Sequence, residues 1–294
     1  MKIIVTGSKG QLGSSIRDLS SGYPELSLVF TDVEELDICD SAEVNHFFEQ
    51  ETPALVINCA AYTAVDKAEK EVVLADKINH LAVANLALAC KKIGARLIHV
   101  STDYLFDGTK SSPYHEKDIV RPQSVYGITK LGGETAILQS RIPSIIIRTS
   151  WLYSAYGSNF VKTMLRLGRE RNQINVVSDQ IGTPTYAGDL ARVILDIAKN
   201  TALNEKYFLT GIYHYSNEGV ASWFDFAKAI FEFQTEIACQ VIPIDTIAYP
   251  TPATRPAYSV LNKSKIKTIF APEIPYWRDS LKLCLIKISK DENE

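Results

Sequence analysis

The sequence has few of the residues that build covalently cross-linked or metal-stabilised folds. It holds 5 cysteines and 5 histidines among 294 residues. The cysteine number is odd and the cysteines stand mostly in apolar surroundings, so we predict free, buried thiols in a reducing compartment and no disulfide framework. The histidines make no metal-ligand spacing with the cysteines, so the sequence predicts no metal site of that type.

Neither the charge nor the hydropathy of the chain points to a nucleic acid or a lipid bilayer. The formal net charge is −3 and the pI is about 6.0, which excludes a global basic field. No apolar run approaches the roughly 20 residues that span a bilayer. Met1 leads directly into a predicted strand, so we expect no signal peptide. We therefore predict a cytoplasmic protein without nucleic-acid or membrane partners.

What the sequence does have is a glycine-rich turn between a strand and a helix at its beginning. Residues 2–6 form a short apolar stretch, Gly7, Gly10 and Gly13 follow, and a helical pattern then continues to about Ser20. This order suits the pyrophosphate of a dinucleotide, because glycines permit close backbone approach and the helix N-terminus offers unpaired N–H groups. The spacing is G-x-x-G-x-x-G, not the commoner G-x-G-x-x-G.

An acidic residue follows at the distance that a dinucleotide site requires. A second strand is predicted at 28–31, and it ends at Asp32, 19 residues after Gly13. An acidic residue at this distance meets the adenosine ribose. Its charge would repel a 2′-phosphate, which predicts NADH as the preferred cofactor with NADPH tolerated. Asp37 and Ile38, on the next loop, are expected beside the adenine.

The pattern of strands and helices predicts a Rossmann-type α/β fold with a doubly wound parallel sheet. Residues 1–150 form the predicted dinucleotide-binding domain, completed by parts of 174–216, and residues 151–294 mainly form a smaller, loop-rich α/β substrate lobe. Strands are expected at 54–58, 96–102, 144–148, 174–178 and 213–216, and helices at 74–92, 126–139, 160–170, 188–199 and 222–233. The last segment is proline-rich, and the polar tail at 287–294 is expected to fray.

Three residues outside the glycine turn carry the predicted chemistry. Tyr126 and Lys130 are four residues apart, which places both on one face of a helix. A neighbouring ammonium lowers the pKa of a phenol, and a tuned tyrosine can pass a proton to a carbonyl oxygen. Thr102 ends a predicted strand, where ligands of open α/β sheets bind and where its hydroxyl can donate to a substrate oxygen. An isolated Tyr-x-x-x-Lys pair on a surface helix is the plain alternative.

Together these residues resemble the extended short-chain dehydrogenase/reductase superfamily. Within it the chain resembles the dTDP-4-dehydrorhamnose reductase family from Met1 to about Ile288. The stretches that carry this closer resemblance are 60–69 (AAYTAVDKAE), 101–108 (STDYLFDG), 148–153 (RTSWLY) and 249–256 (YPTPATRP). The resemblance implies reduction of the C4 ketone of a dTDP-6-deoxyhexulose to dTDP-L-rhamnose.

The resemblance also implies roles for individual residues. Tyr126 would be the proton donor with Lys130 beside it. The nicotinamide cofactor would be held by Gly10, Gln11, Leu12, Asp32, Asp37, Ile38, Ala61, Tyr62 and Thr63, in addition to Gly7 and Gly13 of the turn. Tyr126 and Lys130 are also expected to bind the cofactor, with Lys130 orienting the nicotinamide ribose. The sugar nucleotide would touch Thr102, Asp103, Trp151 and, in the aromatic loop after Trp151, Asn159. Trp151 has an alternative role in lobe packing, and Arg255 either pairs with substrate phosphate or holds the proline-rich loop.

One departure from the family pattern concerns magnesium. Some members bind this ion at a dimer interface through glutamates, one of which follows the last glycine of the turn. Here Gly13 is followed by Ser14 and Ser15, with no acidic residue before Asp18. The metal is therefore doubtful, and a homodimer stays open.

Two other functions remain open at this point. A dehydratase or epimerase could use the same scaffold, but a 4,6-dehydratase typically carries Thr-Asp-Glu where this chain has Tyr104 after Asp103. A non-catalytic regulatory subunit resembling that of methionine adenosyltransferase would keep similar motifs.

Overall fold

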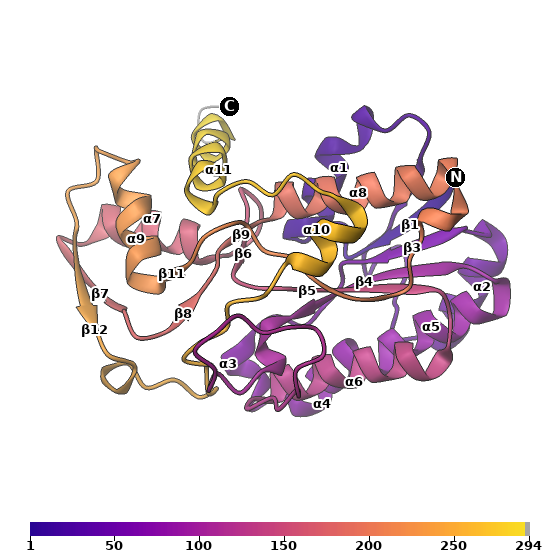
Figure 1. Ribbon diagram of the computed structural model, residues 1–294, viewed down its shortest axis with the longest axis horizontal. Helices are drawn as coiled ribbons and strands as arrows, with labels where there is room; N and C mark the ends of the chain where they lie inside the picture. Colours follow the sequence, from indigo (N-terminus) through magenta and orange to yellow (C-terminus); the bar gives the residue numbers. More distant parts are fainter. Residues whose placement is uncertain (292–294) are drawn as a thin grey trace.

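A six-stranded parallel sheet forms the centre of the protein. The structure is a computed structural model that describes residues 1–291. The strand order is β10-β5-β4-β3-β1-β2, and each neighbouring pair runs parallel (Figure 1). The strands are β1 (Lys2–Thr6), β2 (Ser27–Phe30), β3 (Leu55–Asn58), β4 (Arg96–Thr102), β5 (Ser144–Thr149) and β10 (Gly211–His214). This order confirms the predicted Rossmann-type fold.

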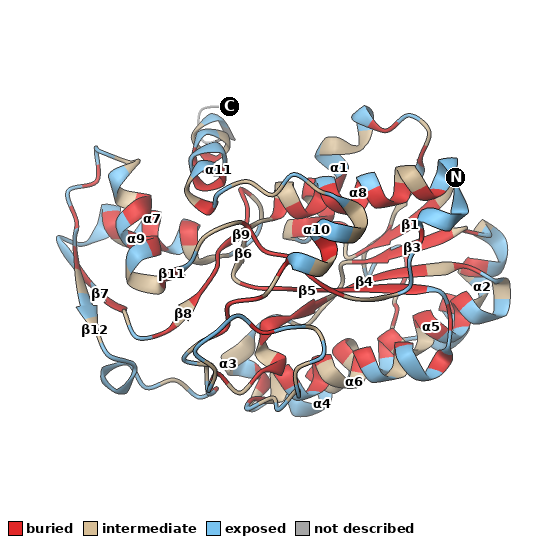
Figure 2. Ribbon diagram, in the orientation of Figure 1, coloured by how far each residue is buried: buried red, intermediate tan, exposed pale blue. Residues whose placement is uncertain are grey.

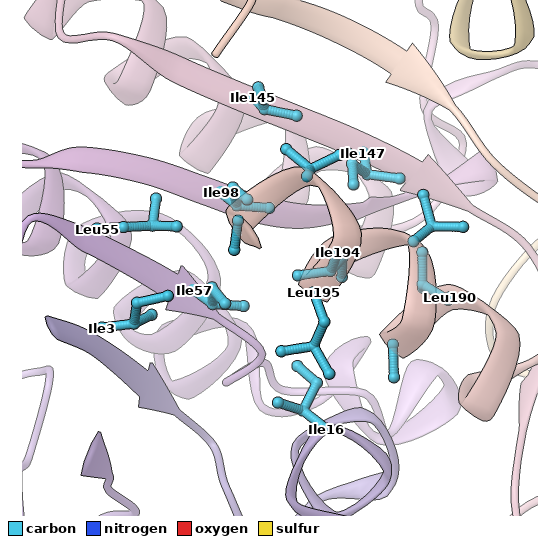
Figure 3. Packing of buried hydrophobic residues seen from close by; sticks show 14 of the residues in the cluster. Ile3, Ile16, Leu55, Ile57, Ile98, Ile145, Ile147, Leu190, Ile194 and Leu195 are labelled. Atoms are coloured by element: carbon cyan, nitrogen blue, oxygen red, sulfur yellow. The ribbon is translucent and has the colours of Figure 1, made fainter. Parts of the chain in front are cut away.

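Helices cover both faces of this sheet, so its central strands carry continuous apolar runs. All residues of β3 and β5 are buried (Figure 2), as expected for parallel strands between two helical layers. One layer contains α1 (Gln11–Leu19) and α8 (Ala187–Leu203), which pack on each other; the other contains α2 (Ser41–Glu51), α5 (Ala82–Ile93) and α6 (Val125–Ser140). In Figure 3, Ile98 and Ile147 of the sheet lie beside Ile194 of α8.

The chain reverses its direction of winding between β1 and β3. From β1 it crosses to β2 on one side, then returns to β3 on the other side of β1. The carboxyl ends of β1 and β3 therefore border a crevice at the topological switch point, which is where open α/β sheets bind ligands. The glycine turn follows β1 directly and so lies in this crevice.

A second lobe, with its own core, lies beyond the carboxyl ends of the strands (Figure 1). It is built around α7 (Phe160–Glu170), α9 (Trp223–Glu232) and α11 (Trp277–Asp291). Short strand pairs complete it: β7 (Gln173–Val177) with β12 (Gln240–Ile244), β8 (Ile181–Gly182) with β11 (Ala221–Ser222), and β6 (Leu152–Tyr153) with β9 (Thr185–Tyr186). The predicted strand at 174–178 thus belongs to this lobe, whereas β10 belongs to the central sheet.

The remaining elements are short or were not expected. They are α3 (Val65–Ala68), α4 (Val72–Asp76), a π-helix (Lys77–Leu81), α10 (Ser264–Phe270) and 3₁₀ turns at Ser20–Gly22, Asp103–Leu105, Glu205–Tyr207 and Thr246–Ala248. The predicted fraying of the tail is wrong up to Asp291, where α11 ends, and residues 292–294 lie outside the described residues. No prediction covered α2, whose Asp40 cap accepts from the N–H groups of Ala42 and Glu43.

One stretch does have the length and composition of a membrane span, so the prediction that no apolar run approaches this length is wrong. Residues Val72–Ile93 form α4, the π-helix and α5 in succession, with a mean hydropathy of 1.3. Its α5 portion packs against α2 and α6, and Val83, Leu86, Ala87 and Cys90 are fully buried there. The apolar side of this stretch thus contributes to the core.

Candidate active site

The glycine turn is shaped so that only glycine fits at two of its positions. Gly7 has φ +65°, and a Cβ there would lie 2.5 Å from the backbone nitrogen of Ala60. A Cβ on Gly13 would lie 2.4 Å from the carbonyl oxygen of Gly7. The turn therefore packs tightly against both its own helix and the end of β3, while Gly10 caps α1 without a side chain. The N-terminus of α1 is left accessible to an anion.

Asp32 lies beside this turn, as the sequence spacing predicts. Its Oδ2 accepts a hydrogen bond from the backbone N–H of Lys9 at 2.9 Å, and its Oδ1 accepts one from Val33. The ammonium of Lys9 pairs with Glu34 and lies 3.8 Å from Glu35. The side chain of Lys9 is thus drawn into an acidic surface cluster.

A cleft of about 470 Å³ opens between the glycine turn and the loops after β2 and β3. We call it the switch-point cleft. The predicted cofactor residues Gly7, Gly10, Asp32, Asp37, Ile38 and Ala61 line it, together with Lys77, which the sequence did not suggest. Asp37 also binds the backbone N–H of Cys39 at 2.9 Å, which fixes its loop.

A π-helix holds the loop after β3, which forms the next part of the cleft wall. Asn79 lies in the π-helix Lys77–Leu81 and is fully buried. Its amide exchanges two hydrogen bonds with the backbone of Tyr62, at 2.9 and 3.0 Å, and also donates to Thr129. π-Helical turns occur frequently at functional sites. Asn79 therefore ties the loop of Tyr62 and Thr63 to α6.

Helix α6 begins at a point that is fixed from two sides. The Ser124 hydroxyl caps it by accepting from Gly127, and Glu69 accepts from the backbone N–H of Val125 at 2.9 Å. A Cβ on Gly127 would lie 2.4 Å from the carbonyl oxygen of Tyr104. The start of α6 thus sits directly on the turn that follows β4, which brings Tyr126 to Thr102.

Thr102 and Tyr126, two of the residues predicted to carry the chemistry, are neighbours in the structure. Burial raises the pKa of the Tyr126 phenol to about 12, although the neighbouring Thr102 hydroxyl opposes the shift. The ring of Tyr104 meets that of Tyr126 edge to face at 5.4 Å between centroids. Tyr126 is therefore a neutral phenol at neutral pH and holds a proton that it can donate.

Lys130 does not act on Tyr126 in the way the sequence suggests. Its Nζ donates to the carbonyl oxygen of Val100 at 2.7 Å and lies 3.3 Å from Nε2 of His99. Burial lowers the pKa of Lys130 to about 8. The prediction that Lys130 lowers the pKa of Tyr126 is wrong for this structure, because burial dominates the phenol and the amine is turned towards β4.

Asp103 is a buried carboxyl next to this pair. Burial raises its pKa to about 6, although the neighbouring Ser259 and Thr102 hydroxyls oppose the shift. Its Oδ1 accepts from the Thr102 hydroxyl at 3.2 Å, whereas Oδ2 has no hydrogen-bond partner within residues 1–291. A buried acceptor without a partner is costly, so Oδ2 is suited to a hydroxyl of a ligand.

A second cleft, of about 560 Å³, contains these groups. This central cleft is lined by the predicted residues Gly10, Gln11, Leu12, Ala61, Thr63, Thr102, Asp103, Tyr126, Lys130, Trp151 and Asn159, and by Trp223. Trp151 has φ +48° and stacks on Trp223 with 3.6 Å between ring centroids and 9° between planes. It thus both packs against the second lobe and faces the cleft.

Asn159 has a structural task in addition to its place on the cleft. Its side chain caps α7 by accepting from Lys162, and it donates to Gln11 Oε1 at 3.0 Å and to the carbonyl oxygen of Ser154 at 2.8 Å. Gln11 in turn accepts from the Ser154 hydroxyl. These bonds link the first turn of α1 to the second lobe.

Arg255 lies farther out, where the two lobes meet again. Its guanidinium makes a bidentate pair with Asp66, at 3.0 and 2.7 Å, and also donates to the carbonyl oxygen of Ala253. The pairing lowers the pKa of Asp66. Arg255 therefore does hold the proline-rich segment, and it also lines a third, outer cleft of about 810 Å³ with Tyr104, Phe160, Trp223 and Tyr249.

The three clefts are continuous. The switch-point and central clefts share Gly10, Cys59 and Ala61, and the central and outer clefts share Thr63, Val65, Tyr104 and Trp223. A single groove thus runs from the glycine turn past Tyr126 to Arg255.

A doubly wound sheet with a glycine turn at its switch point and a Thr–Tyr–Lys group beside it defines the class of short-chain dehydrogenases/reductases. The particular family follows from comparison with known proteins. The chain matches the family described as "RmlD substrate binding domain" over residues 1–290 and belongs to it.

Named relatives are similar over nearly their whole length. The dTDP-4-dehydrorhamnose reductase of Aggregatibacter actinomycetemcomitans is 43% identical over 96% of this chain and 97% of its own. A crystal structure of such a reductase from Clostridium acetobutylicum has a TM-score of 0.91 and 43% identity, covering 98% of this chain and 100% of its own. One from Bacillus anthracis, solved in complex with NADP, has a TM-score of 0.89 and 38% identity, covering 97% and 99%.

Proposed function

We propose that this protein reduces the C4 ketone of dTDP-4-dehydrorhamnose to dTDP-L-rhamnose with a reduced nicotinamide cofactor. Membership of the family and the names of its relatives support the reaction. The observation that carries it to this chain is the single groove that joins the glycine turn to Tyr126. NAD(P)H would supply the hydride when bound.

The residues around the glycine turn fit such a cofactor. The N–H groups at the start of α1 suit a pyrophosphate, and Gly7 and Gly13 allow the turn to pack closely against the backbone of Ala60 and Ser8. Asp32 can accept hydrogen bonds from the adenosine ribose, with Asp37 and Ile38 beside the adenine. Gln11, Leu12, Ala61, Tyr62 and Thr63 would continue the site towards Tyr126 and Lys130, with Tyr62 placed by its backbone bonds to Asn79.

Tyr126 would donate the proton that the substrate oxygen takes up as hydride arrives at C4. With a pKa of about 12 the phenol is protonated at neutral pH, and the Thr102 hydroxyl can bind the same substrate oxygen. Asp103, with its unpartnered Oδ2, would accept from a sugar hydroxyl. Trp151 and Asn159 would border the sugar, and Arg255 the phosphates.

We also propose a preference for NADH over NADPH. The carboxylate of Asp32 would face a 2′-phosphate, and Lys9, the nearest cation of the turn, is paired with Glu34. Lys77 lines the same cleft and is the cation that opposes this preference. Residues 1–291 contain no group of three or more His, Cys, Asp or Glu side chains placed to hold a metal, and the reaction as proposed does not require magnesium.

One assay distinguishes this function from the alternatives. Purified protein would be incubated with reduced cofactor and dTDP-4-keto-6-deoxyhexose, and both cofactor absorbance and sugar products would be followed. We expect cofactor oxidation with formation of dTDP-L-rhamnose. Conversion of the sugar without net oxidation would indicate an epimerase or dehydratase, and absence of both, with cofactor still bound, would indicate a regulatory subunit.

A further inference from the structure

A chain of buried polar side chains connects the glycine turn to Lys130. The Thr6 hydroxyl donates to Asn58 Oδ1 at 2.7 Å, Asn58 Nδ2 lies 3.0 Å from His99 Nδ1, and His99 Nε2 lies 3.3 Å from Lys130 Nζ. Thr6, Asn58, His99 and Lys130 are each at most 2% exposed. Asn58 begins a stretch, 58–61 (NCAA), that contributes to the superfamily resemblance, but neither Asn58 nor His99 is among the predicted site residues.

The orientation of the Asn58 amide follows from a backbone group. The N–H of Ala60 donates to Asn58 Oδ1 at 3.0 Å. A backbone N–H can only donate, so the amide oxygen must face it and the amide NH₂ must face His99. Since that NH₂ donates, Nδ1 of His99 must accept. A neutral His99 therefore carries its proton on Nε2, the nitrogen that faces Lys130.

His99 is neutral because its site is buried. Burial first, and the charge of Lys130 second, hold the pKa of His99 well below its usual range. A neutral imidazole has one N–H and one acceptor. If Nε2 bears the hydrogen, its favourable partner at Lys130 is the lone pair of an amine, because an ammonium would set N–H against N–H.

We propose that Asn58 and His99 are positioning residues: Asn58 fixes the tautomer of His99, whose Nε2–H then favours the neutral amine of Lys130. Cys59, Tyr126 and Glu134 are the other ionisable groups near Lys130. Burial raises the pKa of Cys59 and of Tyr126 to about 12 each, and Glu134 is held by two bonds from Arg148. Burial lowers the pKa of Lys130 to about 8, so Lys130 exchanges a proton within reach of neutral pH.

The consequence for turnover rests on the proposed reductase function. When Lys130 gives up a proton during turnover, the amine so formed accepts the Nε2–H of His99 until solvent returns a proton to it. The bond to His99 therefore stabilises the deprotonated state of Lys130, and the bond to Val100 orients Nζ in both states.

The tautomer of His99 can be measured in the free protein, and this test does not require enzymatic activity. Protein with ¹⁵N-labelled histidine and ¹³C-labelled lysine would be studied by NMR between about pH 6 and 9. Ordinary histidines lose their proton in the lower part of this range. His99→Leu and Lys130→Met variants would assign the two signals. We expect the hydrogen of His99 on Nε2 and a Lys130 pKa well below the usual value of about 10.4. A hydrogen on Nδ1 in the wild-type protein would overturn the proposal.

The variant Asn58→Asp should reverse the tautomer of His99, because it replaces the amide NH₂ of residue 58 by an oxygen. Its carboxylate keeps an oxygen for Thr6 and Ala60 but turns an acceptor towards His99. We expect the His99 hydrogen to move to Nδ1 and the pKa of Lys130 to rise by about one unit or more. Thr6→Val is the matched control, because it removes a bond on the far side of Asn58 and should leave both signals in place.

His99→Leu provides a second test should Asn58→Asp not fold. It removes the N–H, so the pKa of Lys130 should rise although its burial is unchanged. An unchanged Lys130 pKa in either variant would show that burial alone sets it and would overturn the proposal. If turnover depends on the protonation state of Lys130, the pKa of the alkaline limb of the pH–rate profile should rise by the same amount as the pKa of Lys130. A protein without reductase activity would still give the NMR result, so failure of the function and failure of the proposed tautomer are distinguishable.

Discussion

Tyr126 and Lys130 show that two side chains on one helical face can have different electrostatic partners. The four-residue spacing predicts that the ammonium acts on the phenol. In the structure Lys130 contacts Val100 and His99. The pKa of Tyr126 is determined by burial and by the neighbouring Thr102. Tyr126 is consequently suited to be an acid, which is what a ketone reduction requires.

The substitution Tyr126→Phe tests this role. It removes the proton and keeps the ring and its edge-to-face contact with Tyr104, so we expect a loss of roughly 10²–10⁴ in kcat with little change in cofactor affinity. Steady-state kinetics and a cofactor titration would measure the two quantities. Turnover close to that of the wild-type protein at saturating substrate would contradict the role.

Lys130→Met should change two properties together. The substitution keeps the length of the side chain and removes the group expected to orient the nicotinamide ribose, so cofactor affinity should fall. The alkaline limb near pH 8, which the lowered pKa of Lys130 predicts, should disappear because no group of this pKa remains. A variant with normal affinity and an unchanged pH profile, altered only in Tm, would make Lys130 a structural residue.

At the scale of elements, the proposed cofactor preference depends on the loop after β2, where Asp32 contacts the glycine turn. We expect Asp32→Ala to shift the ratio of kcat/KM for NADH over NADPH towards NADPH by about tenfold, because repulsion of a 2′-phosphate is lost but was already partly screened by solvent. Asp32→Asn is the matched control for structure: it keeps an acceptor for the N–H of Lys9 and removes only the charge.

The two Asp32 variants should therefore agree in cofactor ratio. A wild-type protein that clearly favours NADPH would contradict the preference and point to Lys77, which lines the same cleft. Measurement of both reduced cofactors at one fixed ionic strength is essential, because screening changes the size of the effect.

Much of the fold could be predicted from the sequence because its strands are short, apolar and separated by amphipathic helices. Helix α2 was not predicted because only two of its residues, Val44 and Phe48, are buried, which is too few to make a periodic pattern. The π-helix around Asn79 depends on a local shift of hydrogen-bond register that hydrophobic spacing does not encode. His99 stands inside an apolar strand, and only the folded sheet shows that it faces Asn58 and Lys130.

The candidate site was predictable where its residues are close in sequence and not where distant segments meet. Gly7, Gly10 and Gly13 form a local motif, and so do Tyr126 and Lys130. Trp223 was missed because it reaches the groove only through its stacking on Trp151, 72 positions earlier in the sequence. The partner of Arg255 is Asp66, which no local pattern connects to it.

At the scale of the molecule, Asp66 and Arg255 join the first half of the chain to the proline-rich segment. The pair is partly exposed, so its contribution to stability should be modest, on the order of 1 kcal/mol or less. The pKa of Asp66 is lowered, so this contribution is present above the unfolded pKa and is lost as pH falls through the folded one.

The substitution Arg255→Met separates the two roles of this residue. If Arg255 binds substrate phosphate, KM for the sugar nucleotide should rise by about tenfold or more, whereas Asp66→Asn, which keeps the cation, should raise it less. Thermal denaturation would report the structural role in both variants. Equal losses of Tm with unchanged KM would show that Arg255 serves only to hold the proline-rich segment.

The stacked indoles of Trp151 and Trp223 give this protein a built-in optical signal. The sequence contains 3 tryptophans, and the other one, Trp277, is buried away from the groove. Two of the three chromophores are thus parallel, 3.6 Å apart and on the wall of the central cleft. Coupled transitions of such a pair give a circular-dichroism couplet that changes when either ring moves. Entry of a sugar nucleotide can therefore be followed in unlabelled protein, separately from reduction, by its own near-ultraviolet spectrum.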